Sequence, residues 1–335
     1  MPRICIVPRV EGTGGMAAFR MKMERGLRSR GIEVSNDPRQ AADALLLIGG
    51  TRQLGAILRA RRSGTRIVHR LDGLNWLQRA RWTGLRYHVR AEYGNALMRL
   101  LRSRAAHRVI YQSRFIREWW HKWYGPARVP EHVILNGVDL EEFSPQDARR
   151  GEAKRRRVLV VEGSLAGGQN AGLLHAAQLA ESLSAAGLTE LVVAGRVDAR
   201  SRKQAQQGSR VPVQFLDVVP RSDIPALMRS ADLLFPAEVN PPCPNSVMEA
   251  LACGLPVAGF DTGALGEIVT SEAGRLTPYG GDPWKLEPPD VPALSRAAED
   301  ILREPDHFRR GARRRAEEAL GLDKMIDAYL GVLLR

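Results

Sequence analysis

Short apolar runs alternate with longer amphipathic segments along almost the whole chain, and this alternation restricts the fold more than any other feature. In the first half we expect helices at 16–29 and 53–61, between strands at 3–8, 32–34, 44–48, 67–69, 109–111 and 133–135. Strands that alternate with helices of this length are typical of parallel βαβ units, whose helices cover a buried sheet. The sequence therefore predicts an α/β protein.

The same alternation starts again after a polar and charged segment, residues 144–157, which is typical of a linker. A chain of 335 residues also fits two domains better than one, because single cores stop growing at roughly 250–300 residues. We therefore predict two Rossmann-like domains that face each other across a cleft, residues 1–150 and 151–317. The amphipathic C-terminal helix, 318–335, is expected to pack back on the first domain.

The excess of basic residues is concentrated in the first half. Residues 51–130 contain 18 Lys and Arg against three acids, and the formal charge of the whole chain is +13. A localised positive field attracts nucleic acid, anionic lipid headgroups or phosphorylated substrates, and the alternative is a solvated arginine-rich surface. The chain contains no helix-turn-helix, zinc-finger or RNP-type motif, so a nucleic-acid-binding protein is disfavoured.

Cysteine usage and the apolar runs indicate a cytoplasmic protein. Cys5, Cys243 and Cys253 form no CxxC pair, which argues against a disulfide framework and against a zinc site. The opening run, MPRICIVP, is too short and too soon followed by charge to be a signal peptide. No run of about 18 uncharged apolar residues is present that would form a membrane span.

A glycine-rich turn, Gly12-Thr13-Gly14-Gly15, follows the first expected strand. Glycines let a backbone approach a ligand closely, and the next helix offers free N–H groups and the positive end of its dipole to an anion. The run does not match GxGxxG and no acid closes the second strand, so a nicotinamide dinucleotide is disfavoured. The alternative is a tight strand-to-helix turn without a ligand.

A proline-rich loop leads into the helix expected at 245–252. Asn245 or Ser246 is expected to cap this helix, and Glu249 lies one turn inside it. A carboxylate beside a helix N-terminus can accept two ribose hydroxyls while the N–H groups take a phosphate. The alternative is that Glu249 is an ordinary first-turn acid that interacts favourably with the helix dipole.

A histidine and an aspartate follow the strand expected at 67–69. Binding groups gather at the carboxyl ends of strands in open α/β sheets. His69 and Asp72 are therefore candidates for orienting acceptor hydroxyls or for stabilising charge near a leaving group. The alternative for His69 is an ordinary loop histidine held by hydrogen bonds.

Five of the six tryptophans lie within residues 74–124, interleaved with arginine and lysine. Trp and Tyr favour boundaries between apolar and aqueous regions, and Arg and Lys favour anionic headgroups. The pattern predicts a peripheral contact with an anionic membrane, at its inner face. The alternative is that these aromatic side chains are core residues.

Four segments, in the same order, resemble those of glycosyltransferase family 4, the glycosyl transferases group 1. The segment 245–262, NSVMEALACGLPVAGFDT, with Gly263 and Glu267, resembles the donor-sugar motif of that family. The Gly12–Gly15 loop and its helix resemble the family's opening. The segment 133–143, VILNGVDLEEF, resembles its interdomain turn, and 224–236, IPALMRSADLLFP, resembles the approach to the donor loop.

The resemblance implies a retaining, metal-independent glycosyltransferase of the GT-B fold that needs no cofactor. The first domain would bind an acceptor and the second a nucleoside diphosphate sugar, in the synthesis of a cell-surface polysaccharide, a glycolipid or a glycosylated metabolite. His69 and Asp72 are the expected catalytic residues. The expected donor-binding residues are Gly14, Gly15, Gly167, Arg196, Asn245, Ser246 and Glu249.

Three positions depart from the family pattern. Pro241 stands where a second glutamate is usual, and Ser164 and Asn170 stand about where an arginine and a lysine usually neutralise the diphosphate. Such charge-assisted hydrogen bonds contribute ~1.5–3 kcal/mol each, so replacements are needed. Arg196 and backbone N–H groups such as that of Gly167 are the candidates. The alternatives are a non-catalytic relative and a nucleotide-sugar epimerase of the same fold.

Overall fold

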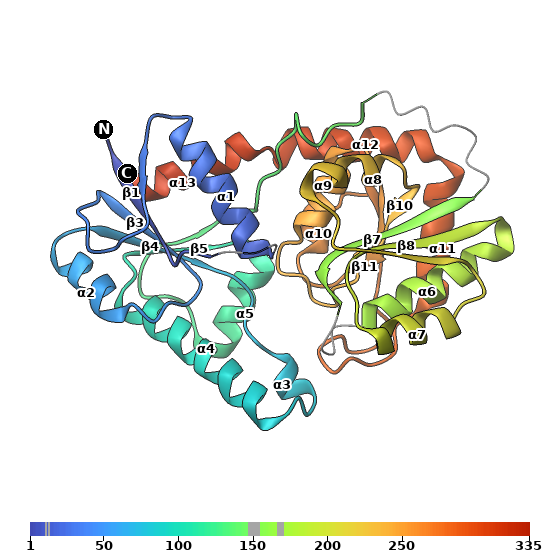
Figure 1. Cartoon of the computed structure of the whole chain (residues 1–335), viewed down its shortest axis with the longest axis horizontal. Helices are drawn as coiled ribbons and strands as arrows, with labels where there is room; N and C mark the ends of the chain where they lie inside the picture. The colour runs from blue at the N-terminus through green and yellow to red at the C-terminus, as the bar shows by residue number, and fades with distance from the viewer. Residues whose placement is uncertain (11, 13, 147–154, 166–170) are drawn as a thin grey trace. The chain divides into compact units, whose positions relative to one another are not determined.

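The computed structural model divides into two compact units (Figure 1). The first unit is Met1–Gly137 together with Leu322–Arg335, and the second is Val138–Gly321. The structure describes the whole chain apart from residues 11, 13, 147–154 and 166–170. Gly167, an expected donor-binding residue, and Asn170, which departs from the family pattern, lie outside the described residues.

The division falls after Gly137 rather than after residue 150. The reason is that hydrogen bonds join the first residues after Gly137 to the C-terminal part of the second unit. Val138 forms a parallel bridge with Gly321, and its N–H donates to the Leu320 carbonyl at 2.8 Å. Arg313 then donates to the Phe143 carbonyl at 2.9 Å. The start of the segment expected as a linker is therefore part of the second unit.

The first unit is a parallel sheet with the strand order β2-β1-β3-β4-β5-β6. Its strands are β1 (Arg3–Val7), β2 (Glu33–Ser35), β3 (Ala44–Ile48), β4 (Arg66–Leu71), β5 (Arg108–Tyr111) and β6 (Glu131–Val133). Its helices are α1 (Gly15–Arg28), α2 (Leu54–Arg62), α3 (Leu77–Ala80), α4 (Leu85–Arg104), α5 (Arg114–Tyr124) and α13 (Leu322–Leu334).

Both faces of this sheet are covered because alternate residues of its central strands point in opposite directions. In β1, Ile4 and Ile6 join a core cluster with apolar side chains of α1 and α13. Cys5 and Val7 join a second cluster with side chains of α2 and α4. The C-terminal helix α13, which lies beside α1 in Figure 1, therefore completes the core of the first unit.

The second unit is also a parallel sheet, with the strand order β12-β11-β10-β7-β8-β9. Its strands are β7 (Arg156–Ser164), β8 (Thr189–Arg196), β9 (Val213–Asp217), β10 (Leu233–Leu234), β11 (Val257–Phe260) and β12 (Gly274–Thr277). Its helices are α6 (Ala171–Leu183), α7 (Ala199–Gln207), α8 (Ile224–Arg229), α9 (Asn245–Ala252), α10 (Leu265–Ile268), α11 (Val291–Arg303) and α12 (Pro305–Ala319).

One close approach fixes where α6 begins relative to the sheet. A Cβ atom at Gly172 would lie 1.8 Å from the carbonyl oxygen of Ala237, in the segment that follows β10. Only glycine lets the helix pack against that backbone. The same contact holds the segment after β10 in place beside the carboxyl end of the sheet.

The winding of the chain reverses within each sheet. In the first sheet, β1 leads to β2 on one side, while β3 starts the run to β6 on the other. In the second sheet the reversal lies between β7 and β10, which are neighbours. Ligands of open α/β sheets bind outside the carboxyl ends of the strands at such switch points. The residues after β1, β3, β7 and β10 are therefore where a site is expected.

Candidate active site

The switch point of the second unit carries two glutamates. Near the end of β7, the Glu162 carboxylate accepts hydrogen bonds from the backbone N–H groups of Ala237 and Glu238, and desolvation raises its pKa to about 7. Desolvation and the neighbouring Glu162 carboxylate raise the pKa of Glu238 to about 8, although the Glu238 side chain keeps contact with solvent. Two carboxyl groups that repel in this way retain at least one proton near neutral pH.

Helix α9 begins at Asn245, as expected, but its cap differs from the expectation. The N-cap position is Pro244, whose side chain makes no capping hydrogen bond, so neither Asn245 nor Ser246 is the capping residue. Both are half-buried in the first turn. Pro241 is buried, and its backbone is so close to Gly263 that a Cβ there would lie 2.4 Å from the Pro241 oxygen.

Glu249 is held by an arginine that sequence reasoning did not identify. Arg221 donates to Glu249 Oε1 at 3.1 Å, and its Nε lies 3.3 Å from Glu142 Oε1. The Glu249 side chain is only 7% exposed, so this ion pair is shielded from water on one side. Arg221 follows β9 on the carboxyl side of the sheet, and that position is the signal that could have identified it.

Arg196 ends β8 and is exposed. It pairs in register with Ser164, the last residue of β7, and its carbonyl accepts the N–H of Leu165 at 2.8 Å. The arginine thus lies beside the position where the family pattern has a cation. The structure brings together Glu162, Ser164 and Arg196 on adjacent strands.

The glycine loop of the first unit lies at the carboxyl end of β1. Gly14 is the N-cap residue of α1, and Gly15 is its first residue. Both are exposed, and a Cβ atom on Gly14 would meet nothing within 4 Å. Helix α1 therefore begins at an exposed pair of glycines at the switch point of this unit.

His69 does not lie at the end of a strand. β4 continues to Leu71, so the expected strand end is wrong by two residues, and His69 is a 0% exposed residue inside the sheet. Its Nε2 is 2.7 Å from the Gly49 carbonyl oxygen, and burial lowers its pKa to about 4. A neutral imidazole therefore holds the Gly49 loop, which follows β3 at the switch point.

Asp72 is fixed by a buried cation. Arg70 forms an ion pair with Asp72 and donates to Gln112 Oε1 at 2.8 Å and to Asn136 Oδ1 at 2.9 Å. Its guanidinium carbon is 3.9 Å from the centroid of the Phe19 ring. Arg70 thus joins the carboxyl ends of β4, β5 and β6 to α1. Asp72 stays partly exposed, so its carboxylate remains accessible to a ligand.

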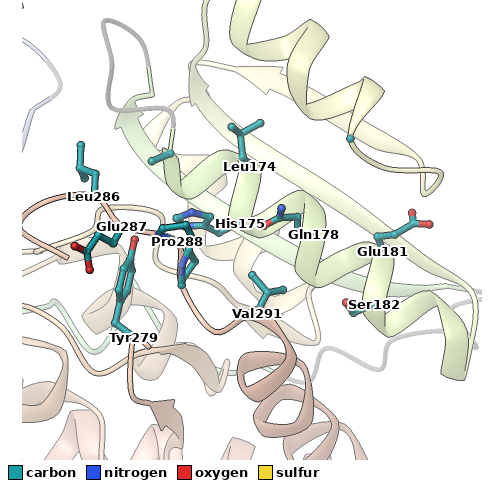
Figure 2. A pocket seen from close by; sticks show the side chains of 13 residues that line it. Leu174, His175, Gln178, Glu181, Ser182, Tyr279, Leu286, Glu287, Pro288 and Val291 are labelled. Atoms are coloured by element: carbon teal, nitrogen blue, oxygen red, sulfur yellow. The ribbon is translucent and has the colours of Figure 1, made fainter. Parts of the chain in front are cut away.

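A pocket of about 660 Å³ lies elsewhere in the second unit, between α6 and the segment that leads into α11 (Figure 2). His175, Gln178, Tyr279 and Glu287 are among the residues that line it. Burial lowers the pKa of His175 to about 4, so its imidazole is neutral. None of the expected donor-binding residues within the described ranges lines this pocket, so it is distinct from the candidate site.

Comparisons with known proteins agree with this architecture. Residues 156–304 match the family model of glycosyl transferases group 1. Among solved structures, a sucrose-phosphate synthase from Thermosynechococcus elongatus superposes with a TM-score of 0.75 at 14% identity, over 99% of this chain and 98% of that chain. Anabaena HepE, in complex with UDP and glucose, gives a TM-score of 0.72 at 16% identity, over 99% of both chains.

Curated relatives match part of the chain. A GDP-mannose-dependent alpha-(1-6)-phosphatidylinositol dimannoside mannosyltransferase from Mycobacterium tuberculosis is 30% identical over 54% of this chain and 46% of its own length. A 2-deoxystreptamine N-acetyl-D-glucosaminyltransferase from Streptomyces fradiae is 31% identical over 32% of this chain and 24% of its own length. The chain spans less than half the length of these relatives.

The two parallel α/β units and their structural neighbours define a GT-B fold, which confirms the expected fold class. The match to the family of glycosyl transferases group 1 covers residues 156–304, which lie within the second unit.

Proposed function

We propose that this protein transfers a sugar from a nucleoside diphosphate sugar to an acceptor hydroxyl, with retention at the anomeric carbon and without a metal ion. The observation that carries the proposal is the Glu249 carboxylate, one turn inside α9 and held by Arg221 at 3.1 Å. A carboxylate fixed in this way accepts ribose hydroxyls, while the N–H groups and dipole at the start of α9 favour the diphosphate.

The names of relatives support this donor class. One is GDP-mannose-dependent, and Anabaena HepE forms a complex with UDP-glucose. The acceptors named are a phosphatidylinositol dimannoside and 2-deoxystreptamine. We therefore propose an acceptor hydroxyl in a glycolipid, a cell-surface polysaccharide or a small glycosylated metabolite.

The remaining site residues take roles that follow from their positions. Arg196, beside Ser164, supplies positive charge to the diphosphate. Gly14 and Gly15 present the N–H groups of α1 to the acceptor or to the diphosphate. Asp72 orients an acceptor hydroxyl, and His69 acts through the Gly49 loop that it holds.

A panel of nucleoside diphosphates tests the proposal. We expect UDP or GDP to raise the melting temperature, because a ligand at about 100 times its Kd stabilises the folded state by about 2.7 kcal/mol. Release of that nucleotide from UDP-glucose or GDP-mannose is then measured with and without a chelator, and we expect the chelator to have no effect. Stabilisation without release would indicate a non-catalytic relative. No stabilisation by either nucleotide would refute the donor site.

A second proposal is that the first unit contacts an anionic membrane through α4. Trp82, Leu85, Val89, Tyr93 and Leu100 are between 46% and 77% exposed. Leu85, Val89, Tyr93 and Leu100 recur at helical spacing, so they form one stripe on α4. Trp119 and Trp120 are instead buried, so the core interpretation holds for those two tryptophans.

Arginines border this apolar stripe on both sides. At 100° per residue, Arg86 and Arg90 lie on one flank of the stripe and Arg99 on the other, and all three are exposed. An apolar stripe between cationic flanks is the arrangement of a helix that lies in an anionic membrane interface. Within the described residues no helix is both long and apolar enough to cross a membrane.

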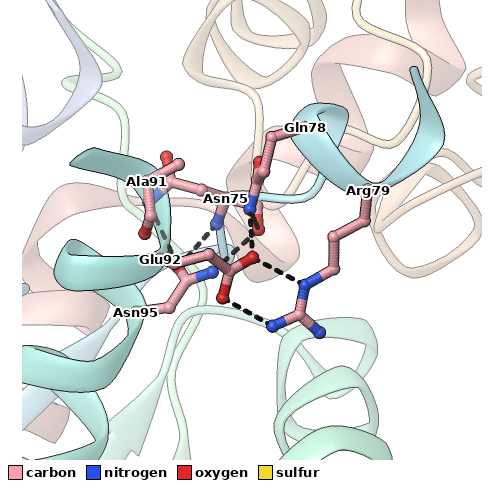
Figure 3. A network of polar contacts seen from close by, with 6 residues as sticks. All are labelled: Asn75, Gln78, Arg79, Ala91, Glu92 and Asn95. Carbon is pink, nitrogen blue, oxygen red and sulfur yellow. Dashed lines mark hydrogen bonds and ion pairs between the residues drawn. The ribbon is translucent and has the colours of Figure 1, made fainter. Parts of the chain in front are cut away.

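The loop that carries Trp82 is fastened to α4 by a polar network (Figure 3). Glu92 of α4 accepts hydrogen bonds from Gln78 at 2.9 Å and from Arg79 at 2.8 Å, and Asn95 accepts from the Asn75 N–H at 2.9 Å. The hydrogen bond from Arg79 lowers the pKa of Glu92 to about 2, so this link stays charged. The network thereby fixes residues 75–79, which precede Trp82, to α4.

Vesicle flotation tests this contact at ~0.1 M salt, where surface charges are partly screened. We expect binding to phosphatidylglycerol vesicles and much weaker binding to phosphatidylcholine vesicles. The double variants Leu85→Ser with Val89→Ser, and Arg86→Gln with Arg90→Gln, should each weaken it. Leu188→Ser, at an exposed apolar residue of the second unit, is the matched control. Equal binding by the stripe variants and the wild type would count against the proposal.

A further inference from the structure

The pocket between α6 and the segment that leads into α11 has no part in the sugar transfer proposed above. Its volume of about 660 Å³ lies within the usual range for small-molecule sites, about 300–1,000 Å³. One wall consists of α6 residues between Ala171 and Ser182, and the other runs from Tyr279 to Val291 (Figure 2). The pocket is therefore large enough to bind a ligand of its own.

The wall opposite α6 is a loop with a strained and well-fixed backbone. Leu286, which lines the pocket, has a φ of +57°, a left-handed value that residues with a Cβ rarely adopt. The loop is closed by a hydrogen bond from the Asp282 N–H to Glu287 Oε2 at 2.7 Å. A second one joins the Asp290 N–H to the Tyr279 carbonyl at 2.6 Å. Backbone strain of this kind is found mainly at functional sites such as ligand clamps, where the surrounding structure maintains it.

The charges of the lining residues indicate which kind of ligand the pocket can take. Within the described residues no lysine or arginine lines it, although the chain contains 50 of them. Its two acidic side chains, Glu181 and Glu287, lie at opposite ends in Figure 2. The Arg210 N–H donates to the Glu181 carboxylate at 2.6 Å and lowers its pKa, so this group is ionised at neutral pH. The lining therefore repels phosphate and attracts a cation.

The part of the pocket between the two carboxylates is apolar and aromatic. Leu174 and Val291 contribute apolar side chains, and the rings of His175 and Tyr279 meet edge to face with centroids 6.3 Å apart. Neither ring has a hydrogen-bond partner in the part of the chain that the structure describes. Burial lowers the pKa of His175 to about 4, so its imidazole is neutral and can accept a hydrogen bond from an amino group, as the Tyr279 hydroxyl can.

We propose that this pocket binds an elongated organic cation with amino groups at both ends, of the aliphatic polyamine class. One terminal ammonium pairs with Glu287 and the other with Glu181, while the methylene chain lies against Leu174 and Val291. An amino group between the two ends donates to His175 or Tyr279. This inference goes beyond the proposed sugar transfer and does not depend on it.

Calorimetric titration with spermidine tests the proposal, with adipate as an anion and hexanediol as a neutral compound of comparable shape. We expect spermidine to bind to the wild type, and the other two to give no heat of binding up to about 10 mM. A chain of formal charge +13 attracts a polycation weakly elsewhere, so the background should be low. Absence of spermidine binding, or equal binding of adipate or hexanediol, would overturn the proposal.

Two variants locate the binding in this pocket. Glu287→Gln keeps an acceptor for the Asp282 N–H but removes the charge, so affinity for spermidine should fall about tenfold. Gln178→Trp, at an exposed lining position of α6, should fill the pocket and abolish binding. Glu272→Gln, at an exposed glutamate of the same unit outside the pocket, is the control and should bind as the wild type does.

The same variants separate this pocket from the nucleotide site. Melting temperatures establish that each variant is folded, and Glu287→Gln should bind UDP or GDP as the wild type does. Unchanged spermidine affinity in Glu287→Gln and Gln178→Trp would refute the pocket, as would a parallel loss of nucleotide affinity in Glu287→Gln. If neither nucleotide binds to the wild type, the proposed sugar transfer fails, while the spermidine titrations still decide whether this pocket binds a cation.

Discussion

Arg221 connects two glutamates that are more than 100 positions apart in the sequence. Its guanidinium pairs with Glu249 and Glu142 and lies 5.1 Å from the centroid of the buried Phe143 ring. Glu249 is the more deeply buried partner, so it depends more on this charge. The ribose anchor that we propose for Glu249 must be held in one orientation to bind two hydroxyls, and Arg221 provides that restraint.

We expect Arg221→Ala to weaken nucleoside diphosphate binding by roughly 10–100-fold, because one charge-assisted hydrogen bond contributes ~1.5–3 kcal/mol. Glu249→Ala should have an effect of similar size on the same measurement. Arg221→Lys should restore part of the affinity, since an ammonium keeps the charge but loses the fork geometry. Calorimetric titration with UDP and GDP measures this, with the exposed Arg303→Ala as control. Unchanged affinity in Arg221→Ala would contradict the role.

His69 provides a pH dependence whose sign follows from its burial. Burial lowers its pKa from 6.5 to about 4, so the folded state keeps it neutral while the unfolded chain protonates it below pH 6.5. Its contribution to stability is therefore present above about pH 6.5 and is lost as the pH falls towards 4. We expect His69→Gln, which can still donate to the Gly49 carbonyl, to be less destabilised by acid than the wild type.

The measurement is urea unfolding followed by tryptophan fluorescence, since five of the six tryptophans lie in the first unit. Comparing the free energy of unfolding at about pH 7 and about pH 5 should show a smaller loss in His69→Gln than in the wild type. His175→Gln is the control. The His175 imidazole is also buried, but it belongs to the second unit, whereas five of the six tryptophans report on the first unit. Identical losses for His69→Gln and the wild type would contradict the argument.

The sequence predicted Glu249 and the start of its helix because local spacing carries that information. It did not predict the Arg221 contact, because an ion pair between residues 28 apart depends on how the segment after β9 packs against α9. It placed His69 at a strand end because the polar side chain interrupts an apolar run. The Gly49 carbonyl lies in the loop after the neighbouring strand β3. Its hydrogen bond with the His69 imidazole allows this polar side chain to be buried inside the sheet.

At the level of elements, apolar runs predicted the central strands well. The expected strand 44–48 coincides with β3, and the expected helix 245–252 coincides with α9. The alternation placed no helix between residues 70 and 108, where α3 and α4 lie. The reason is that α4 exposes apolar residues and arginines together on its outer surface, so its apolar period is masked.

The position of the start of α6 depends on the close contact between Gly172 and the Ala237 backbone, which an added methyl group would disrupt. A Cβ at position 172 would lie 1.8 Å from the Ala237 oxygen, which is backbone and cannot rotate away. We expect Gly172→Ala to lower the melting temperature and to weaken nucleotide binding, because the segment after β10 must shift. Gly55→Ala, in α2 with nothing within 4 Å of the added carbon, is the control and should stabilise by about 0.5–1 kcal/mol. Equal melting temperatures for both variants would contradict this prediction.

At the scale of the whole molecule, the chain leaves the first unit at Gly137, builds the second, and returns at Leu322. The returning helix α13 contributes Met325, Ile326 and Tyr329 to the core of the first unit. The fit is close, since a Cβ at Gly26 of α1 would lie 2.7 Å from Ile326 side-chain atoms. Folding of the first unit therefore depends on the last residues of the sequence, whereas the second unit is built from one continuous segment.

Removing residues 322–335 should therefore unfold the first unit and leave the second one folded. The deletion exposes the apolar face of α1 and one face of the sheet, and losing several buried side chains at ~1.5–3 kcal/mol each exceeds the stability of most domains. Hydrogen exchange read by mass spectrometry should show protection lost across β1, β3 and β4 but kept across β7, β8 and β11. Tyr329→Phe, which keeps the ring, is the control and should preserve protection in both units. A synthetic peptide of residues 322–335 should restore protection to the first unit, whereas full protection without it would show that α13 is not part of the core.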